Sequence, residues 1–236
     1  MPPLVSLRGV DKVFHTPAGD FSALRQVDLE LPAGELVAVV GASGSGKTTL
    51  VHLIAGLDRA SRGELVVDGT ALNTLDETGL ARWRGRRVGV VFQFFQLLPT
   101  LTVLENVMLP MDLCGTLAGA PARARAMWLL DSVGVADQAD KLPSALSGGQ
   151  QQRAAIARAL ANDPPLVLAD EPTGNLDTAT ADRVLGLLGS LVREGKTVVF
   201  VTHEPRARAS VDRVVTLRDG QVVDVTTSTL AEVAGG

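Results

Sequence analysis

The sequence predicts an α/β fold with a mostly parallel sheet and an inserted helical subdomain. In the first and last thirds of the chain, short apolar segments rich in β-branched residues alternate with helical segments, which is typical of a parallel sheet covered by helices. The middle third, about residues 94–159, carries helical patterns without strand signals. We therefore expect the 236 residues to form one domain, residues 1–236, with a core of about residues 1–93 and 160–236.

Hydrophobic periodicity and turn residues place the individual elements. Residues 35–40 form a short apolar run that ends at Gly41, which is the pattern of a buried strand. Further strands are expected at residues 4–10, 22–31, 87–92, 166–169, 197–202, 213–217 and 221–225. Helices are expected at residues 47–57, 101–111, 121–133, 149–161 and 178–194.

Composition excludes several classes of protein. Hydrophobic residues make up 46% and charged residues 20% of the chain, which is typical of a globular protein. The formal net charge of −4 argues against a dedicated nucleic-acid binder. The arginines of residues 82–87 precede a buried strand and have one lone tryptophan among them, so we expect them to form a solvated face. The single cysteine, Cys114, excludes an internal disulfide. The first ten residues lack the pattern of a signal peptide and no apolar run reaches the length of a membrane span, so we expect a cytoplasmic location.

A glycine-rich motif lies between the strand at residues 35–40 and the helix that follows it. Its residues fit the P-loop pattern in full: Gly41, Ala42, Ser43, Gly44, Ser45, Gly46, Lys47 and Thr48, followed by Thr49. Glycines let backbone N–H groups turn toward a polyphosphate, and the helix directs its positive end at the same anion. Lys47 is placed to reach the β- and γ-phosphates, and the Thr48 hydroxyl to ligate Mg²⁺.

Two carboxylates end the apolar strand at residues 166–169. Asp170, at the strand tip, is placed to meet Mg²⁺ directly or through water, and Glu171 to polarise the attacking water. Alone, this segment would be equally consistent with a polar turn. Beside a P-loop it predicts a nucleoside triphosphatase.

A second anion site is predicted where Ser147, Gly148 and Gly149 begin a helix, followed by Gln150. A hydroxyl, free N–H groups and the helix dipole favour an anion there, but without a lysine the segment cannot cradle a triphosphate alone. It looks like half of a composite site. With this motif the chain resembles the nucleotide-binding subunit of an ATP-binding cassette (ABC) transporter. The match covers nearly the whole chain, and its elements fall in the family's order.

The resemblance implies a P-loop NTPase core, a small antiparallel β subdomain and the inserted helical subdomain. It also implies roles for further residues. Gln93 resembles the Q-loop glutamine, a catalytic residue and metal ligand. His203 resembles the switch histidine, which contacts the γ-phosphate, and Asp177 resembles the D-loop aspartate, which lies near the nucleotide.

Aromatic residues at two places have more than one interpretation. Phe14 stands where the family usually has an adenine-stacking tyrosine, although Phe21 in the same loop also offers a ring. Phe94, Phe95, Leu97 and Leu98 form an apolar run after Gln93. This run either packs in the core or, as in the family, lines the groove that receives a helix from the membrane subunit, and one residue can serve both purposes.

The resemblance implies an ATPase that uses ATP and Mg²⁺. Two copies would bind head to tail, with each ATP between one subunit's P-loop and the other's Ser147-Gly148-Gly149. Only residues 226–236 follow the last predicted strand, so we expect the permease to be a separate chain and this subunit to lie on the inner face of the membrane. The P-loop, taken with Leu104-Glu105-Asn106-Val107 and the following Leu109-Pro110, is similar to that of the macrolide-exporter and lipoprotein-release branch. In that branch the ATPase powers transport or mechanotransmission through a permease with a large extracytoplasmic domain.

Two other functions remain as alternatives. An ABC ATPase of translation or DNA repair usually carries two cassettes or a long coiled-coil insertion, whereas this sequence has one P-loop and no heptad stretch. A small-molecule kinase on a P-loop core would not need the segment at residues 147–150. The sequence leaves open the transported substrate and the direction of transport.

Overall fold

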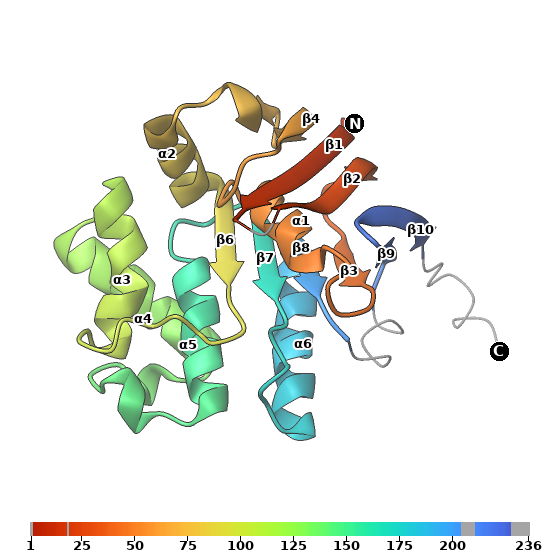
Figure 1. Cartoon of the computed structure of the whole chain (residues 1–236). Helices are drawn as coiled ribbons and strands as arrows, with labels where there is room; N and C mark the ends of the chain where they lie inside the picture. The colour runs from red at the N-terminus through yellow and green to blue at the C-terminus, as the bar shows by residue number, and fades with distance from the viewer. Residues whose placement is uncertain (1, 18, 204–210, 228–236) are drawn as a thin grey trace.

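Two β-sheets and a group of helices build the molecule (Figure 1). The computed structural model describes residues 2–17, 19–203 and 211–227. A four-stranded antiparallel sheet has the order β2-β1-β4-β5, and a six-stranded sheet has the order β10-β9-β3-β8-β7-β6. In the larger sheet the strands from β9 to β6 are parallel, and β10 pairs with β9 in the antiparallel sense. The predicted α/β class with a mostly parallel sheet is confirmed.

The elements follow each other closely along the chain. The strands are β1 (Val5–Thr16), β2 (Gly19–Leu31), β3 (Leu36–Val40), β4 (Arg62–Val67), β5 (Thr70–Ala71), β6 (Val88–Val91), β7 (Leu166–Asp170), β8 (Thr197–Val201), β9 (Arg213–Arg218) and β10 (Gln221–Thr227). The α-helices are α1 (Lys47–Ile54), α2 (Glu77–Arg87), α3 (Val103–Cys114), α4 (Gly119–Ser132), α5 (Gly148–Ala159) and α6 (Thr178–Arg193).

Two hydrophobic clusters hold these layers together. One cluster lies between the antiparallel sheet, helix α1 and one face of the larger sheet, and it includes Leu24, Leu53 and Val199. The other joins the opposite face of that sheet to helices α3–α6, and Phe200 and Met111 both belong to it. The inserted helices therefore share a core with the sheet, because their apolar faces have no other surface on which to pack.

Two strands and one α-helix, β4, β5 and α2, were not predicted from the sequence. β4 begins with the polar residues Arg62, Gly63 and Glu64, and β5 has only two residues, so neither shows a strand pattern. Helix α2 buries only Leu80 and Trp83 among its eleven residues, which is too few to produce an apolar period. The arginines of residues 82–87, read as a solvated face, lie on this helix.

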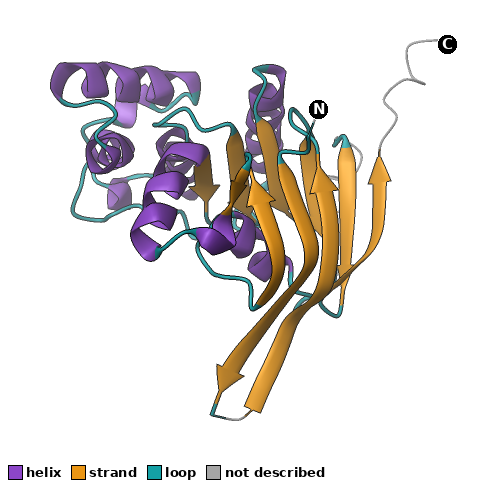
Figure 2. Cartoon of the chain, turned by 90° about the horizontal axis from the view of Figure 1, so that it is seen from above, coloured by secondary structure: helices purple, strands orange, loops and turns teal. Residues whose placement is uncertain are grey.

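The first hairpin is longer than predicted. β1 and β2 continue past Val10 and Ser22 to a hairpin end that reaches out from the body of the molecule (Figure 2). Both strands remain paired there, with Phe14 opposite Phe21. Within the described residues, no helix has the length and apolar character that crossing a bilayer would require.

The parallel sheet decides where the polar motifs meet. Four of its strands lie side by side in the order β3-β8-β7-β6, and all four are parallel. The P-loop follows β3, His203 follows β8, Glu171 follows β7 and Gln93 follows β6. Because the carboxyl ends of parallel strands lie along one edge of a sheet, these four groups line the same edge.

Candidate active site

Close backbone packing shapes the loop between β3 and α1. Gly46 has a φ of 101°, and a Cβ atom there would lie 2.6 Å from the carbonyl oxygen of Ala23. A Cβ atom on Gly41 would lie 2.3 Å from the carbonyl oxygen of Leu217. Only glycine fits both positions, so the loop can turn its N–H groups inward just before helix α1 begins at Lys47.

Lys47 points back over this loop. Its buried ammonium group donates hydrogen bonds to the carbonyl oxygens of Gly41 (3.0 Å) and Ala42 (2.8 Å). Burial lowers the pKa of Lys47, and the nearby charges of Glu171 and Asp170 oppose that shift. The Ser45 hydroxyl is also buried, and the described residues give it no hydrogen-bond partner. A polyphosphate in the loop would supply acceptors for both groups.

Thr48 and Asp170 bring two oxygen ligands together across the site. The Thr48 hydroxyl donates to Asp170 Oδ1 at 3.3 Å, which joins the start of α1 to the end of β7. Burial raises the pKa of Asp170, and the hydrogen bond from Thr48 opposes this shift. A hydroxyl and a carboxylate at this spacing are a donor set suited to a hard cation such as Mg²⁺.

Glu171 and His203 form a direct contact. Glu171 Oε1 lies 2.5 Å from His203 Nε2, and both side chains are partly exposed at the edge of the sheet. Glu171 has a φ of 48°, an uncommon backbone conformation for a residue with a side chain. This turn redirects the chain immediately after Asp170, so the two neighbouring carboxylates address different partners. The two residues were predicted separately, and the structure joins them.

Gln93 reaches the same neighbourhood from β6. A Cβ atom on Gly174 would lie 3.4 Å from Glu171 Oε2 and 3.5 Å from Gln93 Nε2, so both side chains flank this glycine. Asn175 Nδ2 also donates to the backbone carbonyl of Gln93 at 3.3 Å. Asn175 lies two residues before Asp177, and its link to Gln93 could not be predicted from the sequence.

Helix α5 begins with a capping box. Ser147 Oγ accepts a hydrogen bond from the Gln150 N–H at 3.3 Å, and Gln150 Oε1 accepts one from the Ser147 N–H at 2.9 Å. The side chain of Gln150 is therefore engaged in capping. The Ser147 cap satisfies one of the free N–H groups at the helix start, and others remain available to an anion.

Asp177 likewise caps its own helix. It precedes α6 and accepts hydrogen bonds from the Thr180 N–H (3.0 Å) and the Thr180 hydroxyl (2.6 Å). These bonds lower the pKa of the Asp177 carboxyl. A Cβ atom on Gly149 would lie 2.5 Å from Thr180 Cγ2, so the starts of α5 and α6 are in close contact.

We expect Asp177→Ala to lower the free energy of unfolding at neutral pH, because the start of α6 loses its cap. Since the folded-state pKa of Asp177 is depressed, its stabilising contribution is present above the unfolded-state pKa and is lost as the pH falls through the folded value. The difference in the free energy of unfolding between wild type and Asp177→Ala should therefore become smaller as the pH drops below about 4. Urea unfolding at several pH values measures this difference. Asp177→Asn is the matched control, since asparagine caps equally well, and an unchanged difference at low pH would contradict the assignment.

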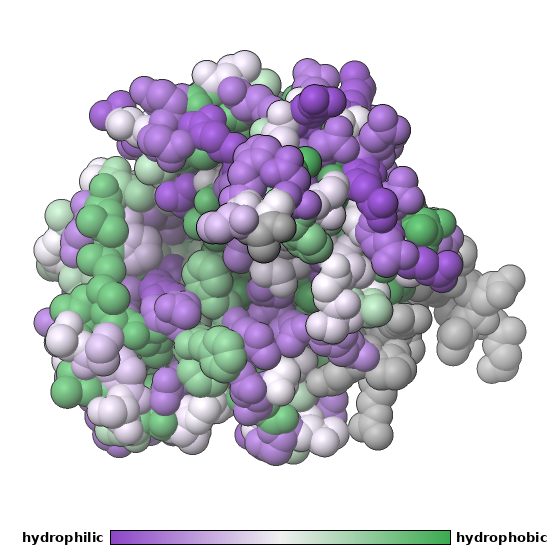
Figure 3. Space-filling view, in the orientation of Figure 1, coloured by the Kyte–Doolittle hydropathy of each residue, from purple (hydrophilic) through white to green (hydrophobic). Residues whose placement is uncertain are grey.

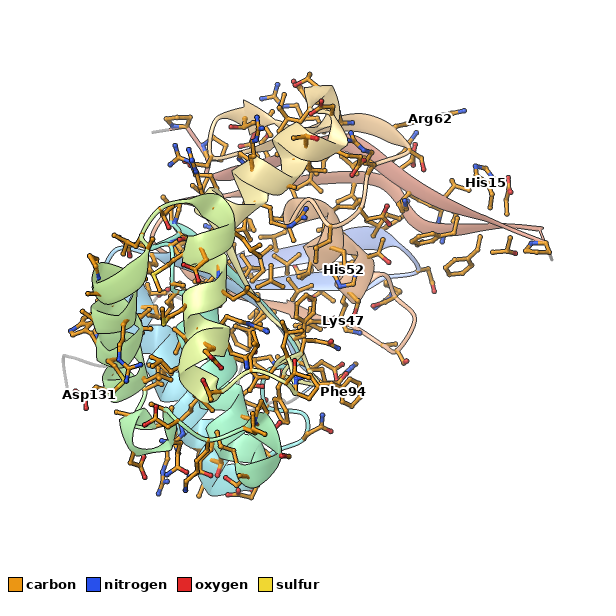
Figure 4. All side chains as sticks on the ribbon, turned by 90° about the vertical axis from the view of Figure 1, so that its left-hand side faces the viewer. His15, Lys47, His52, Arg62, Phe94 and Asp131 are labelled. Carbon is orange, nitrogen blue, oxygen red and sulfur yellow. The ribbon has the colours of Figure 1, made fainter. Side chains whose placement is uncertain are left out.

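Phe14 lies on the projecting part of the β1–β2 hairpin and is partly exposed. The ammonium of Lys12 sits 4.6 Å from the centre of its ring, and the same ammonium donates to Asp58 Oδ1 at 2.6 Å. Phe21, the alternative ring, is more exposed. His15 pairs with Asp20 at the exposed hairpin end, away from Lys47 and Phe94, whereas His52 lies on α1 (Figure 4).

The segment Ser147-Gly148-Gly149 is not joined to the P-loop in the described part of the chain. Among the hydrogen bonds and ion pairs of the described residues, none connects Ser147, Gly148 or Gly149 with the P-loop. The neighbours of Gly148 are instead the side chains of Phe95 and Leu176. A single chain thus provides a P-loop edge and a separate helix start with free N–H groups.

Two residues near the site, Lys12 and Arg158, were not predicted from the sequence. Lys12 covers the ring of Phe14. Arg158 of α5 donates to the carbonyl oxygens of Phe95 (2.9 Å) and Gln96, just after Gln93. No local pattern marks either residue, because both contacts join segments far apart in the sequence.

The sequence matches a known family model. The model describes the ABC transporter family and matches residues 24–174. The chain is 44% identical over 225 residues to the lipoprotein-releasing system ATP-binding protein LolD of Hyphomonas neptunium, covering 95% of this chain and 98% of that protein. It is also 47% identical over 221 residues to the macrolide export ATP-binding/permease protein MacB 1/2 of Paracoccus denitrificans, covering 94% of this chain and 33% of that longer protein.

Solved structures show the same fold. The chain is similar to the ATP-binding cassette MJ0796 in a dimeric, post-hydrolysis state bound to ADP and Pi, with a TM-score of 0.89 and 41% identity. The alignment covers 94% of this chain and 98% of that one. A second dimeric structure of MJ0796, described as a bacterial ABC transporter cassette, matches with a TM-score of 0.88.

Proposed function

The chain belongs to the ABC transporter family and is the ATP-binding and ATP-hydrolysing subunit of such a transporter. From this premise we propose that it works as a head-to-tail dimer coupled to a membrane permease. One observation carries the proposal: in the described residues Ser147, Gly148 and Gly149 have no hydrogen bond or ion pair to the P-loop of their own chain. Their free N–H groups are therefore available to a nucleotide held by a second copy. The dimeric MJ0796 cassettes support this arrangement.

In such a dimer each ATP lies between the P-loop of one copy and the start of α5 of the other. The charge of the γ-phosphate is then shared by groups from two chains. ATP binding favours the closed dimer for this reason, and hydrolysis, which separates the phosphate from ADP, weakens it. The alternating closure and opening of the dimer would move the membrane partner that is attached to it.

The residues at the edge of the sheet have distinct tasks in hydrolysis. Lys47 exchanges the carbonyl oxygens of Gly41 and Ala42 for the β- and γ-phosphate oxygens. Glu171 orients the attacking water and accepts its proton. His203 holds Glu171 Oε1 on one side and the γ-phosphate on the other. Gln93, beside Glu171, helps to position the water.

Thr48 and Asp170 would hold Mg²⁺, with Gln93 as a third ligand. Their oxygen donors fit this ion. Mg²⁺ keeps several waters and binds through one or two protein groups plus substrate phosphates, so few protein ligands are needed. When bound, the ion offsets the charge that develops on the phosphates.

Phe14 would stack on the adenine ring. Phenylalanine keeps the aromatic face that stacking needs and lacks the hydroxyl of tyrosine. The Lys12 ammonium already lies over this ring, and it would add a positive charge near the base.

The membrane partner would dock near the run Phe94, Phe95, Leu97 and Leu98, where Phe94 is 69% exposed. An exposed phenylalanine next to Gln93 favours an interface role for this position, whereas Leu97 packs against the core. The names of the LolD and MacB relatives refer to lipoprotein release and macrolide export, which supports a permease of that branch. For that permease we propose a large extracytoplasmic domain. The subunit would then lie against the cytoplasmic face of the membrane.

Purification of the tagged chain from detergent-solubilised membranes of its own host tests the proposal. We expect a protein with several membrane spans to co-purify, and its presence to change the rate of phosphate release. Co-purification with ribosomes or DNA-repair proteins instead would favour the non-transport ABC ATPase. Transfer of phosphate to an acceptor molecule, rather than its release, would favour a kinase.

A further inference from the structure

Lys12 of β1 is a lysine withdrawn from water whose ammonium makes three contacts. It donates to Asp58 Oδ1 at 2.6 Å and to the carbonyl oxygen of Arg59 at 3.0 Å, and it lies 4.6 Å from the centre of the Phe14 ring. Only 11% of the Lys12 side chain is exposed. A cation shielded from water is attracted to the face of an aromatic ring more strongly than an exposed one. The contact with Lys12 therefore restricts the orientation of the Phe14 ring.

A second lysine of the chain shows which of these contacts is distinctive. The ammonium of Lys196 donates to Asp163 Oδ1 at 2.6 Å and to a backbone carbonyl oxygen at 3.2 Å, and 14% of this side chain is exposed. Its surroundings resemble those of Lys12, except that the cation–π contacts of the described residues include Lys12 and not Lys196. An ion pair with an aspartate is common to both lysines, so the contact with Phe14 is what distinguishes Lys12.

The contacts of Lys12 join the Phe14 ring to the helix that begins at the P-loop. Asp58 lies in the segment that follows α1, and its N–H donates to the carbonyl oxygen of His52 in that helix at 3.3 Å. A second link runs beside the first, because the N–H of Val13 donates to Ser61 Oγ at 3.0 Å. The part of β1 that carries the ring is therefore fastened to the chain that leaves α1.

The ring of Phe14 has no polar group through which a hydrogen bond could orient it. It lies opposite Phe21 in the projecting hairpin, and 37% of Phe14 is exposed. Apolar residues gather elsewhere on the face seen in Figure 3, over the helical part at the left, whereas the surface over α2 and the antiparallel sheet is mostly hydrophilic. An exposed ring on this hairpin is therefore not part of that apolar surface, and a cation on its face supplies the direction that a hydroxyl cannot.

A cation on one face of the ring also favours an aromatic group on the opposite face. The π-electrons make both faces of a phenylalanine ring negative, which is why an ammonium is attracted to one of them. The ammonium draws this electron density toward itself. Repulsion between the ring and the π-electrons of a stacked base is then reduced.

We propose that Lys12 is a positioning residue of the nucleotide site. It holds the ring of Phe14 in the orientation that stacks on the base, and it fixes this ring relative to α1, which begins at the phosphate-binding Lys47. This inference rests on the proposed function, because the base is that of the bound ATP. Since Lys12 acts through Phe14, its removal should weaken the binding of a nucleotide and spare the binding of a triphosphate that has no base.

Equilibrium titration of the full chain with ATP and with inorganic tripolyphosphate, both with Mg²⁺, tests this role. In Lys12→Met we expect the dissociation constant for ATP to rise about three- to tenfold and that for tripolyphosphate to stay unchanged. Lys12→Arg should restore the affinity for ATP, because a guanidinium keeps the charge and also stacks on rings. Lys196→Met is the matched control, which removes a lysine with the same kind of ion pair and should leave both affinities unaltered.

A double variant shows whether Lys12 acts through the ring. In a Phe14→Leu chain, which has already lost the ring, adding Lys12→Met should weaken ATP binding no further. Melting temperatures report the folding of every variant. If Lys12→Met is unfolded at the temperature of the titration, Lys12→Gln takes its place with the same expected result, because its amide still donates to Asp58 but carries no charge.

Three outcomes would overturn the inference and leave the proposed function standing. The first is an unchanged affinity for ATP in Lys12→Met, and the second is an equal loss for ATP and tripolyphosphate, which would make Lys12 a purely structural residue. The third is a further loss when Lys12→Met is added to Phe14→Leu. A wild-type chain that binds tripolyphosphate but not ATP would instead contradict the proposed function itself.

Discussion

Glu171→Gln is expected to slow ATP hydrolysis by about 100- to 10,000-fold, the range in which a general base acts. Glutamine keeps the size of the side chain and its hydrogen bond to His203, but its amide cannot accept a proton from water. ATP binding should remain, because Lys47, Thr48 and the P-loop backbone are untouched. Phosphate release measures the rate, and equilibrium titration with labelled ATP measures the affinity.

Two controls make this result specific. Glu194→Gln makes the same chemical change at an exposed residue after α6 and should leave the rate unaltered. Lys47→Ala should lower the affinity for ATP itself, since it removes the cation that faces the phosphates. Rapid turnover by Glu171→Gln would disprove the assignment of Glu171 as the base.

Ser147→Asp is expected to abolish ATP-driven dimerisation. Aspartate caps a helix as well as serine does, so the start of α5 should remain folded. Its negative charge, however, would face the γ-phosphate held by the other copy, and like charges at an interface oppose association. The measurement is sedimentation of Glu171→Gln chains, which bind ATP without rapid hydrolysis, with and without the added Ser147→Asp change.

The chain offers a matched control for this substitution. Thr102 caps α3 in a second capping box, in which its hydroxyl accepts from the Glu105 N–H at 3.2 Å. Thr102→Asp therefore introduces the same charge at another helix start and should leave the ATP-dependent dimer intact. A dimer that forms equally well with Ser147→Asp would remove the basis for a nucleotide pocket shared between two chains.

Short motifs whose residue types and spacing are required by their chemistry could be predicted from the sequence. The P-loop, the pair Asp170-Glu171 and the segment that begins at Ser147 each depend on consecutive residues and on a strand or helix that the local pattern reveals. The buried strands were predicted to within a few residues because their apolar runs are continuous. Helix α2 was not predicted because Leu80 and Trp83 are its only buried residues, so its sequence lacks the apolar periodicity of a helix.

Contacts between distant segments could not be predicted. The hydrogen bond between Thr48 and Asp170 spans 122 positions, and that between Arg158 and the Phe95 carbonyl spans 63. The capping roles of Gln150 and Asp177 are local, yet their sequence pattern is the same whether the side chain caps a helix or meets a nucleotide. Only the tertiary structure distinguishes a side chain that caps a helix from one that is free to contact a nucleotide.

The sequence by itself determined the family and its ATPase chemistry, and it predicted the residues that would carry that chemistry, because a phosphate cradle is built from one continuous stretch of backbone and its nearest side chains. The tertiary structure alone decided which of these groups meet. The order β3-β8-β7-β6 lines up Lys47, His203, Glu171 and Gln93, and the packing of α5 beside β6 brings Arg158 to the carbonyl oxygen of Phe95. Contacts between distant residues depend on how sheets and helices pack in space, and local sequence periodicity does not encode that packing.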